Sequence, residues 1–349
     1  MAATPRDDLR DRERAHLFEA LPGQHLGALW RVYANALTPE PVKREVPHRW
    51  AWKDLRPLLY EAARLVPTEE AERRVLMLLN PGLGGEAAIT PTLYAGMQII
   101  LPGEIARSHR HTPNAIRFIV EGEGAFTAVN GERTVMKPGD FVTTPTWVWH
   151  DHGNESDQAV VWLDGLDLPL VATLSSVFYQ KYPDIQQPVS RPIGDSSRRY
   201  ARGFSPARVP LPRHYSPIVN YPYVEAREAL ATMAESDHPD DYDGYLLQYI
   251  NPLTGGPVLP TMAAYLQWIP PHSTLKEHQH TSAAVYLGVE GRGVITIDGQ
   301  AYAWEPHDVI VVPSWCRHQH QNPGDEPAIL FSFTDDPVIR ALALYREAD

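Results

Sequence analysis

Residues 103–154 read GEIARSHRHTPNAIRFIVEGEGAFTAVNGERTVMKPGDFVTTPTWVWHDHGN, and the pattern of histidines and turn residues in them is the clearest structural signal of the chain. His109 and His111 stand two positions apart within it, and His150 follows near its end. Alternate side chains of a β-strand point to the same face, so His109 and His111 project side by side. A third imidazole from another strand then completes a metal site. The alternative is a set of histidines that satisfy only local hydrogen bonds, and the regular spacing argues against it.

Turn-forming residues frame these histidines at the intervals of a cupin, a small antiparallel β-barrel. They are Gly103, Gly122, Gly139, Pro145 and Asn154. A cupin commonly carries a glutamate shortly after its second histidine, where this chain has Ala115 and Ile116. We therefore expect three neutral imidazoles and no carboxylate ligand. Facial binding of this kind leaves about three coordination positions open, which suits non-haem iron and an anionic, bidentate substrate.

The same arrangement recurs near the C-terminus, at a nearly constant offset in residue number. The first copy supplies His109, His111, Gly122, Pro145, Trp147, His150, His152 and Asn154. The second copy supplies His278, His280, Gly291, Pro313, Trp315, His318, His320 and Asn322. So dense a match predicts a bicupin. The fold is expected to be mainly β, with two antiparallel double-stranded β-helix (jelly-roll) barrels and a helical N-terminal arm.

Periodicity and proline content predict four segments. Helical spacing over 6–20, 24–36 and 55–65 predicts a helical arm over 1–90. From Thr92 the period becomes two, so 91–170 is expected to be the first, catalytic cupin. Closely spaced prolines and a helix over 224–234 predict an extended connection over 171–240, and 241–349 is the second cupin.

Composition excludes several classes of protein. The chain has 349 residues, which suits two domains, and 43% hydrophobic residues, which is ordinary for a globular protein. Its net charge of −12 argues against nucleic acid and anionic membranes as partners. The one cysteine, Cys316, excludes an intrachain disulfide. No apolar run has the length of a membrane span or a signal peptide, so we expect a cytoplasmic protein.

The first copy carries more than a general cupin signature. It contains HRH at 109–111, Arg-Phe at 117–118 and WVWHDHGN at 147–154, followed by WLDGLDLP at 162–169. These motifs closely resemble the gentisate 1,2-dioxygenase family, which includes salicylate 1,2-dioxygenases and 1-hydroxy-2-naphthoate dioxygenases. The resemblance covers nearly the whole chain.

The resemblance implies a role for each matching residue. Fe(II) would be held by His109, His111 and His150. The substrate carboxylate would lie near Arg117 and Gln98, and also near Arg73. His152 would be a hydrogen-bonding partner for substrate or oxygen, and Asp164 would lie near the far side of the ring.

The residues themselves support most of these roles and leave some open. The guanidinium of Arg117 has the fork geometry that a carboxylate needs, although a surface salt bridge is the alternative. Arg73 is either a pocket residue or a solvated one, in which case Arg74 faces inward. Asp164 is equally open to either interpretation. Tyr94 and Gly96 share a strand face with Gln98, so we expect them to line the same pocket.

The second cupin keeps His278, His280 and His318 as a possible second metal site. Tyr286 stands where the first cupin has Arg117, and His272 and His307 replace motif glycines. Without the arginine, this barrel should not turn over the same substrate. The alternative is a polar interior in which the histidines bond one another.

The predicted function is Fe(II)-dependent cleavage of a 2-hydroxybenzoate by O₂, between the carbons that bear the carboxylate and the hydroxyl. Gentisate is the first choice of substrate, followed by salicylate or 5-substituted salicylates and 1-hydroxy-2-naphthoate. Two rival classes are an oxalate-type bicupin decarboxylase, which would need glutamate ligands, and a non-catalytic metal-binding bicupin. The family resemblance also implies a homotetramer.

Overall fold

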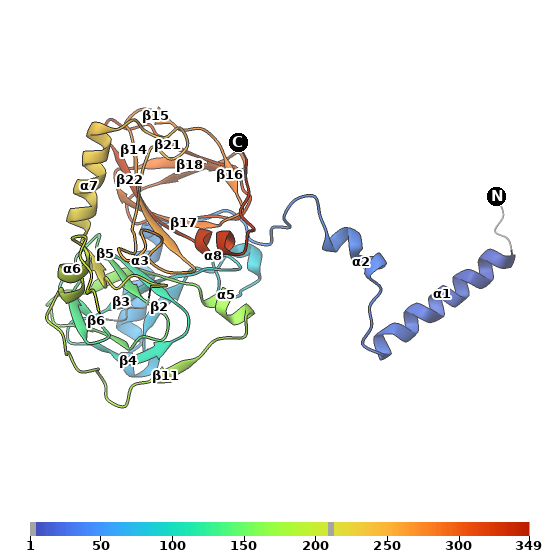
Figure 1. The fold of residues 1–349 in the computed structure, drawn as a ribbon, viewed down its shortest axis with the longest axis horizontal. Coiled ribbons are helices and arrows are strands. Elements are labelled where there is room, and N and C mark those ends of the chain that lie inside the picture. Colours follow the sequence, from blue (N-terminus) through green and yellow to red (C-terminus); the bar gives the residue numbers. More distant parts are fainter. Residues whose placement is uncertain (1–4, 209–212, 349) are drawn as a thin grey trace. The chain divides into compact units, whose positions relative to one another are not determined.

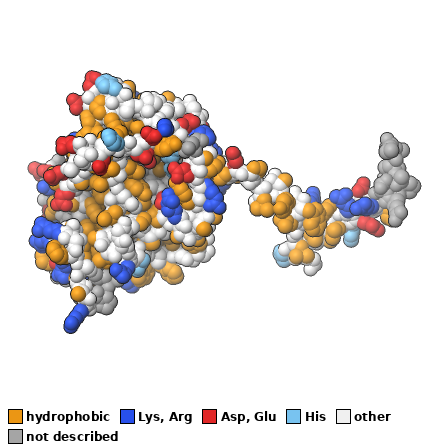
Figure 2. Space-filling model, turned by 45° about the horizontal axis from the view of Figure 1, so that its top comes forward, with side chains coloured by type: hydrophobic (Ala, Val, Ile, Leu, Met, Phe, Trp, Pro, Cys, Tyr) orange, Lys and Arg blue, Asp and Glu red, His pale blue; other side chains and the backbone are white. Residues whose placement is uncertain are grey.

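The computed structural model describes residues 5–208 and 213–348, and the chain divides into two compact units, Met1–Val42 and Lys43–Asp349. The first unit holds the helices α1 (Pro5–Gly23) and α2 (Leu29–Ala36), as predicted for the N-terminal arm. Every residue of α2 is exposed, and Figure 2 shows hydrophobic side chains along this unit. The described side chains of α2 therefore form no core of their own.

The second unit contains two β-barrels, drawn in cyan to green and in orange to red in Figure 1. The first barrel has a six-stranded sheet in the order β12-β8-β5-β10-β3-β2 and a five-stranded sheet in the order β11-β4-β9-β6-β7. Its strands are β2 (Arg74–Met77), β3 (Tyr94–Ile100), β4 (Ile105–His111), β5 (Ala115–Glu121), β6 (Ala125–Val129), β7 (Glu132–Val135), β8 (Phe141–Thr144), β9 (His150–Asn154), β10 (Val160–Leu166), β11 (Tyr179–Lys181) and β12 (Asn220–Tyr221).

The second barrel repeats this plan. Its six-stranded sheet has the order β1-β20-β17-β22-β14-β13, and β15-β21-β18-β19 and β16-β23 form the opposite wall. Its strands are β1 (His48–Trp50), β13 (Tyr245–Gln248), β14 (Ala263–Ile269), β15 (Ser273–Thr274), β16 (Gln279–His280), β17 (Ala284–Glu290), β18 (Gly293–Ile297), β19 (Gln300–Trp304), β20 (Val309–Val312), β21 (His318–Asn322), β22 (Ala328–Thr334) and β23 (Glu347–Ala348).

Short helices connect and flank the barrels. They are α3 (Trp52–Leu65), α4 (Thr68–Ala71), the 3₁₀ helix η1 (Pro81–Leu83), α5 (Leu168–Thr173), α6 (Asp195–Tyr200), α7 (Tyr223–Ser236) and α8 (Asp336–Ala341). The expected bicupin fold is confirmed. No helix in the described part of the chain combines the length and apolar character needed to cross a bilayer.

Residues 1–90 contain two strands that the sequence did not predict. β2 extends the first barrel beside β3, whereas β1 crosses to the second barrel and pairs with β20. In return β12, which precedes the second barrel in the chain, pairs with β8 of the first. These strands are too short to show a period, and β1 finds its partner only far along the chain. The two barrels therefore exchange edge strands.

The exchange makes the internal repeat longer than the cupin itself. Helices α3 and α7 have 14 residues each and follow the exchanged strands β1 and β12. The backbone N–H of Trp52 donates to Asp308 in the second barrel at 2.8 Å, and that of Tyr223 donates to Asp140 in the first at 3.0 Å. At the start of each helix, a backbone N–H that has no partner within the helix thus donates to an aspartate of the other barrel.

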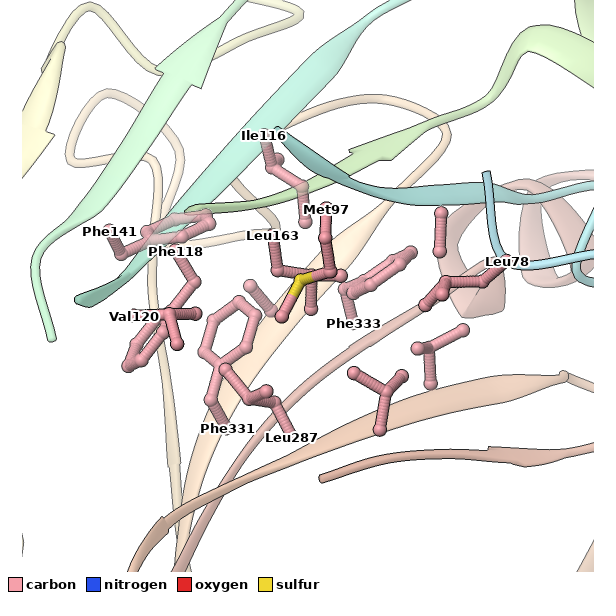
Figure 3. Packing of buried hydrophobic residues seen from close by; sticks show 14 of the residues in the cluster. Leu78, Met97, Ile116, Phe118, Val120, Phe141, Leu163, Leu287, Phe331 and Phe333 are labelled. Atoms are coloured by element: carbon pink, nitrogen blue, oxygen red, sulfur yellow. The ribbon is translucent and has the colours of Figure 1, made fainter. Parts of the chain in front are cut away.

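A hydrophobic core lies between the two six-stranded sheets. Figure 3 shows Met97, Phe118 and Leu163 of the first barrel packed against Leu287 and Phe331 of the second, and the Phe118 and Phe331 rings stack with centroids 4.2 Å apart. The predicted alternation from Thr92 is confirmed. Ala95, Met97 and Ile99 of one β3 face lie in this core, together with Leu93 just before the strand. The opposite face, with Gly96 and Gln98, is left to the interior of the first barrel.

The glycines that the second cupin lacks are replaced without loss of the turns. His272 (φ 53°) and His307 (φ 72°) adopt the left-handed conformation of Gly103 (φ 78°) and Gly139 (φ 84°). This conformation costs a non-glycine residue roughly 1–2 kcal/mol. The barrel framework therefore tolerates this strain.

A reciprocal pair of hydrogen bonds also joins the barrels. The Thr92 hydroxyl donates to buried Asp335 at 2.5 Å, and the Thr261 hydroxyl donates to buried Asp167. We expect Thr92→Val to lower the free energy of unfolding by about 1.5–3 kcal/mol, because a buried carboxylate loses a donor. Urea unfolding followed by fluorescence measures this change. The control is Thr232→Val at an exposed position of α7, which should change stability by less than about 0.5 kcal/mol. Equal effects of the two substitutions would contradict the role of the bridge.

Candidate active site

The first barrel gathers His109, His111 and His150 from two neighbouring strands of its five-stranded sheet. β4 carries His109 and His111, β9 carries His150, and His109 lies directly opposite His150 in the register. One ring nitrogen from each histidine lies within 4.8 Å of the others. His109 and His150 are buried, and His111 is partly buried. The side chains converge without any carboxylate in the group.

Backbone carbonyls orient the imidazoles of His111 and His150, whereas Nδ1 of His109 lies near both a carbonyl and the guanidinium of Arg73. The Nδ1 atoms of His109, His111 and His150 lie 3.2, 2.7 and 3.0 Å from the carbonyl oxygens of Arg107, Pro113 and Val148. A neutral imidazole that donates from Nδ1 presents a bare Nε2, which is the form that binds metals. The buried Nε2 of His150 has no hydrogen-bond partner among the described residues. The site therefore fits a divalent metal ion.

Burial keeps these imidazoles neutral. It lowers the pKa of His109 to about 2 and that of His111 to about 4, with smaller contributions from Arg73 and Arg117. The pKa of His150 is also held well below its usual value, mainly by burial. Neutral ligands leave the full charge of a bound metal available to attract an anion.

The opposite wall of the barrel presents a row of residues from three adjacent strands. Gly96 of β3 lies opposite Asp164 of β10, which in turn lies opposite Arg117 of β5. Directly opposed residues of antiparallel strands point to the same face, so the three positions share the interior. Gln98, two positions along β3 from Gly96, is buried on this face.

Arg117 and Asp164 form a buried ion pair. Arg117 Nε lies 3.2 Å from Asp164 Oδ1, and both side chains are at least nine-tenths buried. Arg117 Nη1 donates to Thr144 at 2.6 Å, while Nη2 has no hydrogen bond within the described residues. Burial raises the pKa of Asp164 to about 6, and Arg117 opposes that shift. Arg117 is thus held through Nε and Nη1, which leaves Nη2 for an anion.

His152 lies beside the triad on the same strand face as His150. Its ring centroid is 5.9 Å from that of His150 and 5.7 Å from that of Trp162. The side chain is fully buried, and neither ring nitrogen has a hydrogen-bond partner in the described part of the chain. A buried polar group in this state costs free energy unless a ligand satisfies it.

Arg73 and Arg74 go to different places. Arg73 Nη2 lies 2.5 Å from His109 Nδ1 and donates to the Arg107 carbonyl at 3.0 Å. Arg74 is buried in an ion pair with Glu104 and also donates to the carbonyls of α3. Arg73 is therefore the arginine beside the histidines, and Arg74 ties β2 to its surroundings.

Tyr94 folds back over Gly96. A Cβ built on Gly96 would meet Val75 Cγ1 at 2.6 Å and Tyr94 Oη at 2.8 Å. Burial raises the pKa of Tyr94, and the nearby Asp164 adds to this effect. Tyr94 and Gly96 therefore lie with Asp164 at one end of the row.

The sequence did not single out two residues that contact the site. Thr144 accepts the hydrogen bond from Arg117, and Tyr179 of β11 places its ring 5.3 Å from that of His109. Thr144 directly precedes the motif residue Pro145, and this position in the sequence could have identified it. Nothing local marks Tyr179, because β11 reaches β4 only through the tertiary fold.

Comparisons with known proteins agree with this geometry. The Cupin domain family matches residues 96–166 and 265–334. Gentisate 1,2 dioxygenase 1 of Aquipseudomonas alcaligenes is 42% identical over 97% of this chain and 96% of its own, and a Comamonas 5-aminosalicylate 1,2-dioxygenase is 38% identical over 95% and 89%. The crystal structure of a salicylate 1,2-dioxygenase from Pseudoaminobacter salicylatoxidans with gentisate superposes with a TM-score of 0.91 at 32% identity, covering 100% of this chain and 95% of that one.

The fold and site together define a bicupin in which each barrel gathers three histidines that could hold a metal ion. The chain belongs to the gentisate and salicylate 1,2-dioxygenase family of ring-cleaving dioxygenases.

Proposed function

We propose that the first barrel uses Fe(II) and O₂ to open the ring of a 2-hydroxybenzoate between the carboxylate-bearing and hydroxyl-bearing carbons, with gentisate as the leading substrate. The observation that carries this proposal is the pairing of a neutral three-histidine site with a buried arginine, Arg117, whose Nη2 is available to a ligand. Relatives that act on gentisate and 5-aminosalicylate support the same substrate class.

His109, His111 and His150 would hold the metal through one ring nitrogen each. Bound there, Fe(II) supplies a Lewis acid for the phenol and open positions for substrate and O₂. The balanced reaction adds both atoms of O₂ to the substrate. The carbon bearing the carboxylate becomes a ketone, and the neighbouring carbon becomes a second carboxylate.

The remaining residues bind and orient the ring. Arg117 Nη2 would donate a charge-assisted hydrogen bond to the substrate carboxylate. Asp164 and Thr144 would hold the guanidinium in a fixed orientation. Arg73 would add positive charge beside the triad. His152, which has two unsatisfied ring nitrogens, would hydrogen-bond the substrate or oxygen.

The pocket wall would be formed by Tyr94, Gly96 and Gln98 on β3. The glycine allows the Tyr94 hydroxyl to lie over the strand. The size of this wall would decide which ring substituents are accepted. Salicylate, 5-substituted salicylates and 1-hydroxy-2-naphthoate are therefore the alternatives to gentisate.

The two rival classes receive less support. An oxalate-type bicupin would use a glutamate in each metal site, whereas both groups of candidate ligands among the described residues contain only histidine. A non-catalytic bicupin does not account for a buried arginine and an unsatisfied His152 beside one triad.

Anaerobic loading with Fe(II), followed by oxygen uptake against a substrate panel, tests the function. The panel contains gentisate, salicylate, 5-aminosalicylate, 1-hydroxy-2-naphthoate and oxalate. We expect the highest kcat/KM with gentisate, and neither oxygen uptake nor CO₂ release with oxalate, since a decarboxylase would release CO₂ from oxalate without net consumption of O₂. Absence of uptake with every aromatic carboxylate would refute the proposal.

Gly96→Ala tests the pocket wall. The added methyl must displace Tyr94 or Val75. The activation free energy for bulky substrates should therefore rise by about 1–3 kcal/mol, while the turnover of gentisate changes little. Steady-state kinetics across the panel measure the selectivity. In a double variant with Val75→Ala, strain against β2 is relieved and the selective loss should persist. A uniform effect on all substrates would mean that Gly96 serves only strand geometry.

We also propose a cytoplasmic homotetramer, on the family resemblance alone. Light scattering of the purified full chain measures the mass of the assembly. A mass four times that of the chain is expected, and a monomer would exclude this assembly.

A further inference from the structure

The second barrel carries a triad with nearly the same geometry as the first. One nitrogen each of His278, His280 and His318 lies within 4.8 Å of the others. The ring centroids are separated by 4.3, 5.0 and 5.5 Å, compared with 4.2, 4.8 and 5.2 Å in the first barrel. The ligand arrangement has therefore been kept even though the sequence around it has changed.

Carbonyl groups orient these imidazoles as they do in the first barrel. Nδ1 of His280 lies 2.8 Å from the Ser282 carbonyl, and Nδ1 of His318 lies 3.0 Å from the Cys316 carbonyl. The Nε2 atom of fully buried His318 has no hydrogen-bond partner within the described residues. A histidine network that satisfied itself would use this nitrogen, so the geometry favours a metal ligand.

The charges around the second triad are reversed. Tyr286 and Ser332 occupy the opposed strand positions that Arg117 and Asp164 hold in the first barrel. Asp243 lies two residues before β13 and lines the cavity beside the second triad. A positively charged anion site has thus become a neutral and acidic one.

A cavity of about 170 Å³ opens beside the triad and is lined by Asp243, Tyr286 and Glu347. Glu347 lies directly opposite His280 in the pairing of β16 with β23, and Asp243 lines the same cavity as His280. The one arginine of the lining, Arg340, is already paired with Asp336 at 2.8 Å. The cavity therefore offers the carboxylates of Asp243 and Glu347 to a cation, and its one arginine already pairs with a carboxylate through Nε.

An unsatisfied amide points to a bound ligand as well. Gln267 is 1% exposed and lines the cavity. Its Nε2 donates to the Asp243 carbonyl at 2.9 Å, but its Oε1 has no partner among the described residues. A metal-bound water or a neutral hydroxylic ligand would supply the missing donor.

We propose that the second barrel is a separate divalent transition-metal site, held by His278, His280 and His318, that is closed to aromatic carboxylates and open to water or neutral hydroxylic ligands. In the first barrel, an anionic substrate balances the metal charge. In the second, Asp243 and Glu347 balance it, so the site favours the cation itself. This inference concerns binding and does not depend on the proposed ring-cleavage activity.

Co²⁺ binding to the chelator-treated full chain tests the proposal. We expect two Co²⁺ per chain by metal analysis, and one in each of two matched double variants, His111→Ala/His150→Ala and His278→Ala/His318→Ala. Salicylate should shift the visible Co²⁺ spectrum of the variant that keeps the first site and leave the other unchanged. One Co²⁺ per wild-type chain, or a salicylate shift at the second site, would overturn the proposal.

Asp243→Asn separates the charge argument from the histidines. Co²⁺ affinity at the second site should fall by roughly tenfold, as is typical when a residue that supports the metal ligands is replaced. Co²⁺ affinity at the first site should not change. Circular dichroism verifies the fold of each variant. If a double variant misfolds, His280→Gln replaces it, and retention of two tight Co²⁺ sites in a folded His280→Gln protein would equally overturn the proposal.

Discussion

Replacement of His111 by alanine is expected to abolish ring cleavage, with a loss of roughly a thousandfold or more in kcat/KM. His111 supplies one of three convergent nitrogens and is oriented by the Pro113 carbonyl at 2.7 Å. Two histidines from different strands do not hold the metal in the same geometry. Oxygen uptake and iron content of the purified variant are the measurements.

The matched control for His111→Ala is His280→Ala, which removes the corresponding ligand from the second barrel. This control should keep ring cleavage per first-site iron, because its barrel lacks an equivalent of Arg117. Retained iron and activity in His111→Ala would contradict the assignment. Loss of activity in folded His280→Ala with its first-site iron intact would show that both barrels take part in turnover.

The second large effect is expected from Arg117→Ala, which should raise KM steeply and also lower kcat. The arginine would both bind and align the carboxylate, so its loss affects the ground state and the transition state. Metal content should not change. Steady-state kinetics with the best substrate of the panel measure the two constants.

Arg117→Ala also leaves Asp164 as a buried, unpaired carboxylate. Breaking such a pair typically costs about 3–5 kcal/mol of stability. The double variant Arg117→Ala/Asp164→Ala should recover stability but not KM, which separates substrate binding from folding. Near-normal kinetics in Arg117→Ala would place the substrate carboxylate elsewhere.

The barrel framework could be predicted because its signals are local and repeated. The period of two from Thr92 placed Met97 in the core and Gln98 in the barrel, and the HRH motif placed two ligands on one face. The histidine spacing was repeated closely enough to reveal both barrels. Pattern and structure agree here because a strand fixes the direction of every side chain along it.

The edge-strand exchange could not be predicted from such signals. β1 has three residues, and its partner β20 lies in the other barrel. Helices α3 and α7 occupy equivalent places but share little sequence, so the larger repeat becomes visible only from their common capping by Asp308 and Asp140. A strand of three residues is too short to show a hydrophobic period, so its sequence does not indicate a distant pairing partner.

The sequence could not decide which of Arg73 and Arg74 faces the pocket, for a different reason. Glu72 has a φ of 52°, a conformation that turns the chain just before β2 and sends Arg73 and Arg74 in different directions. A strand-period argument fails at such a turn. The same region of the second repeat places Asp243 at the cavity beside the second triad, and the sequence did not single out this residue.

The most direct test of the central claim is the mass of the product formed under ¹⁸O₂ by the Fe(II)-loaded enzyme and gentisate. We expect a ring-opened dicarboxylate that carries both labelled atoms when it is analysed before its ketone exchanges with water. One label should lie in the new carboxylate and one in the ketone. An unlabelled product, or release of CO₂ with the ring intact, would contradict ring cleavage by a dioxygenase.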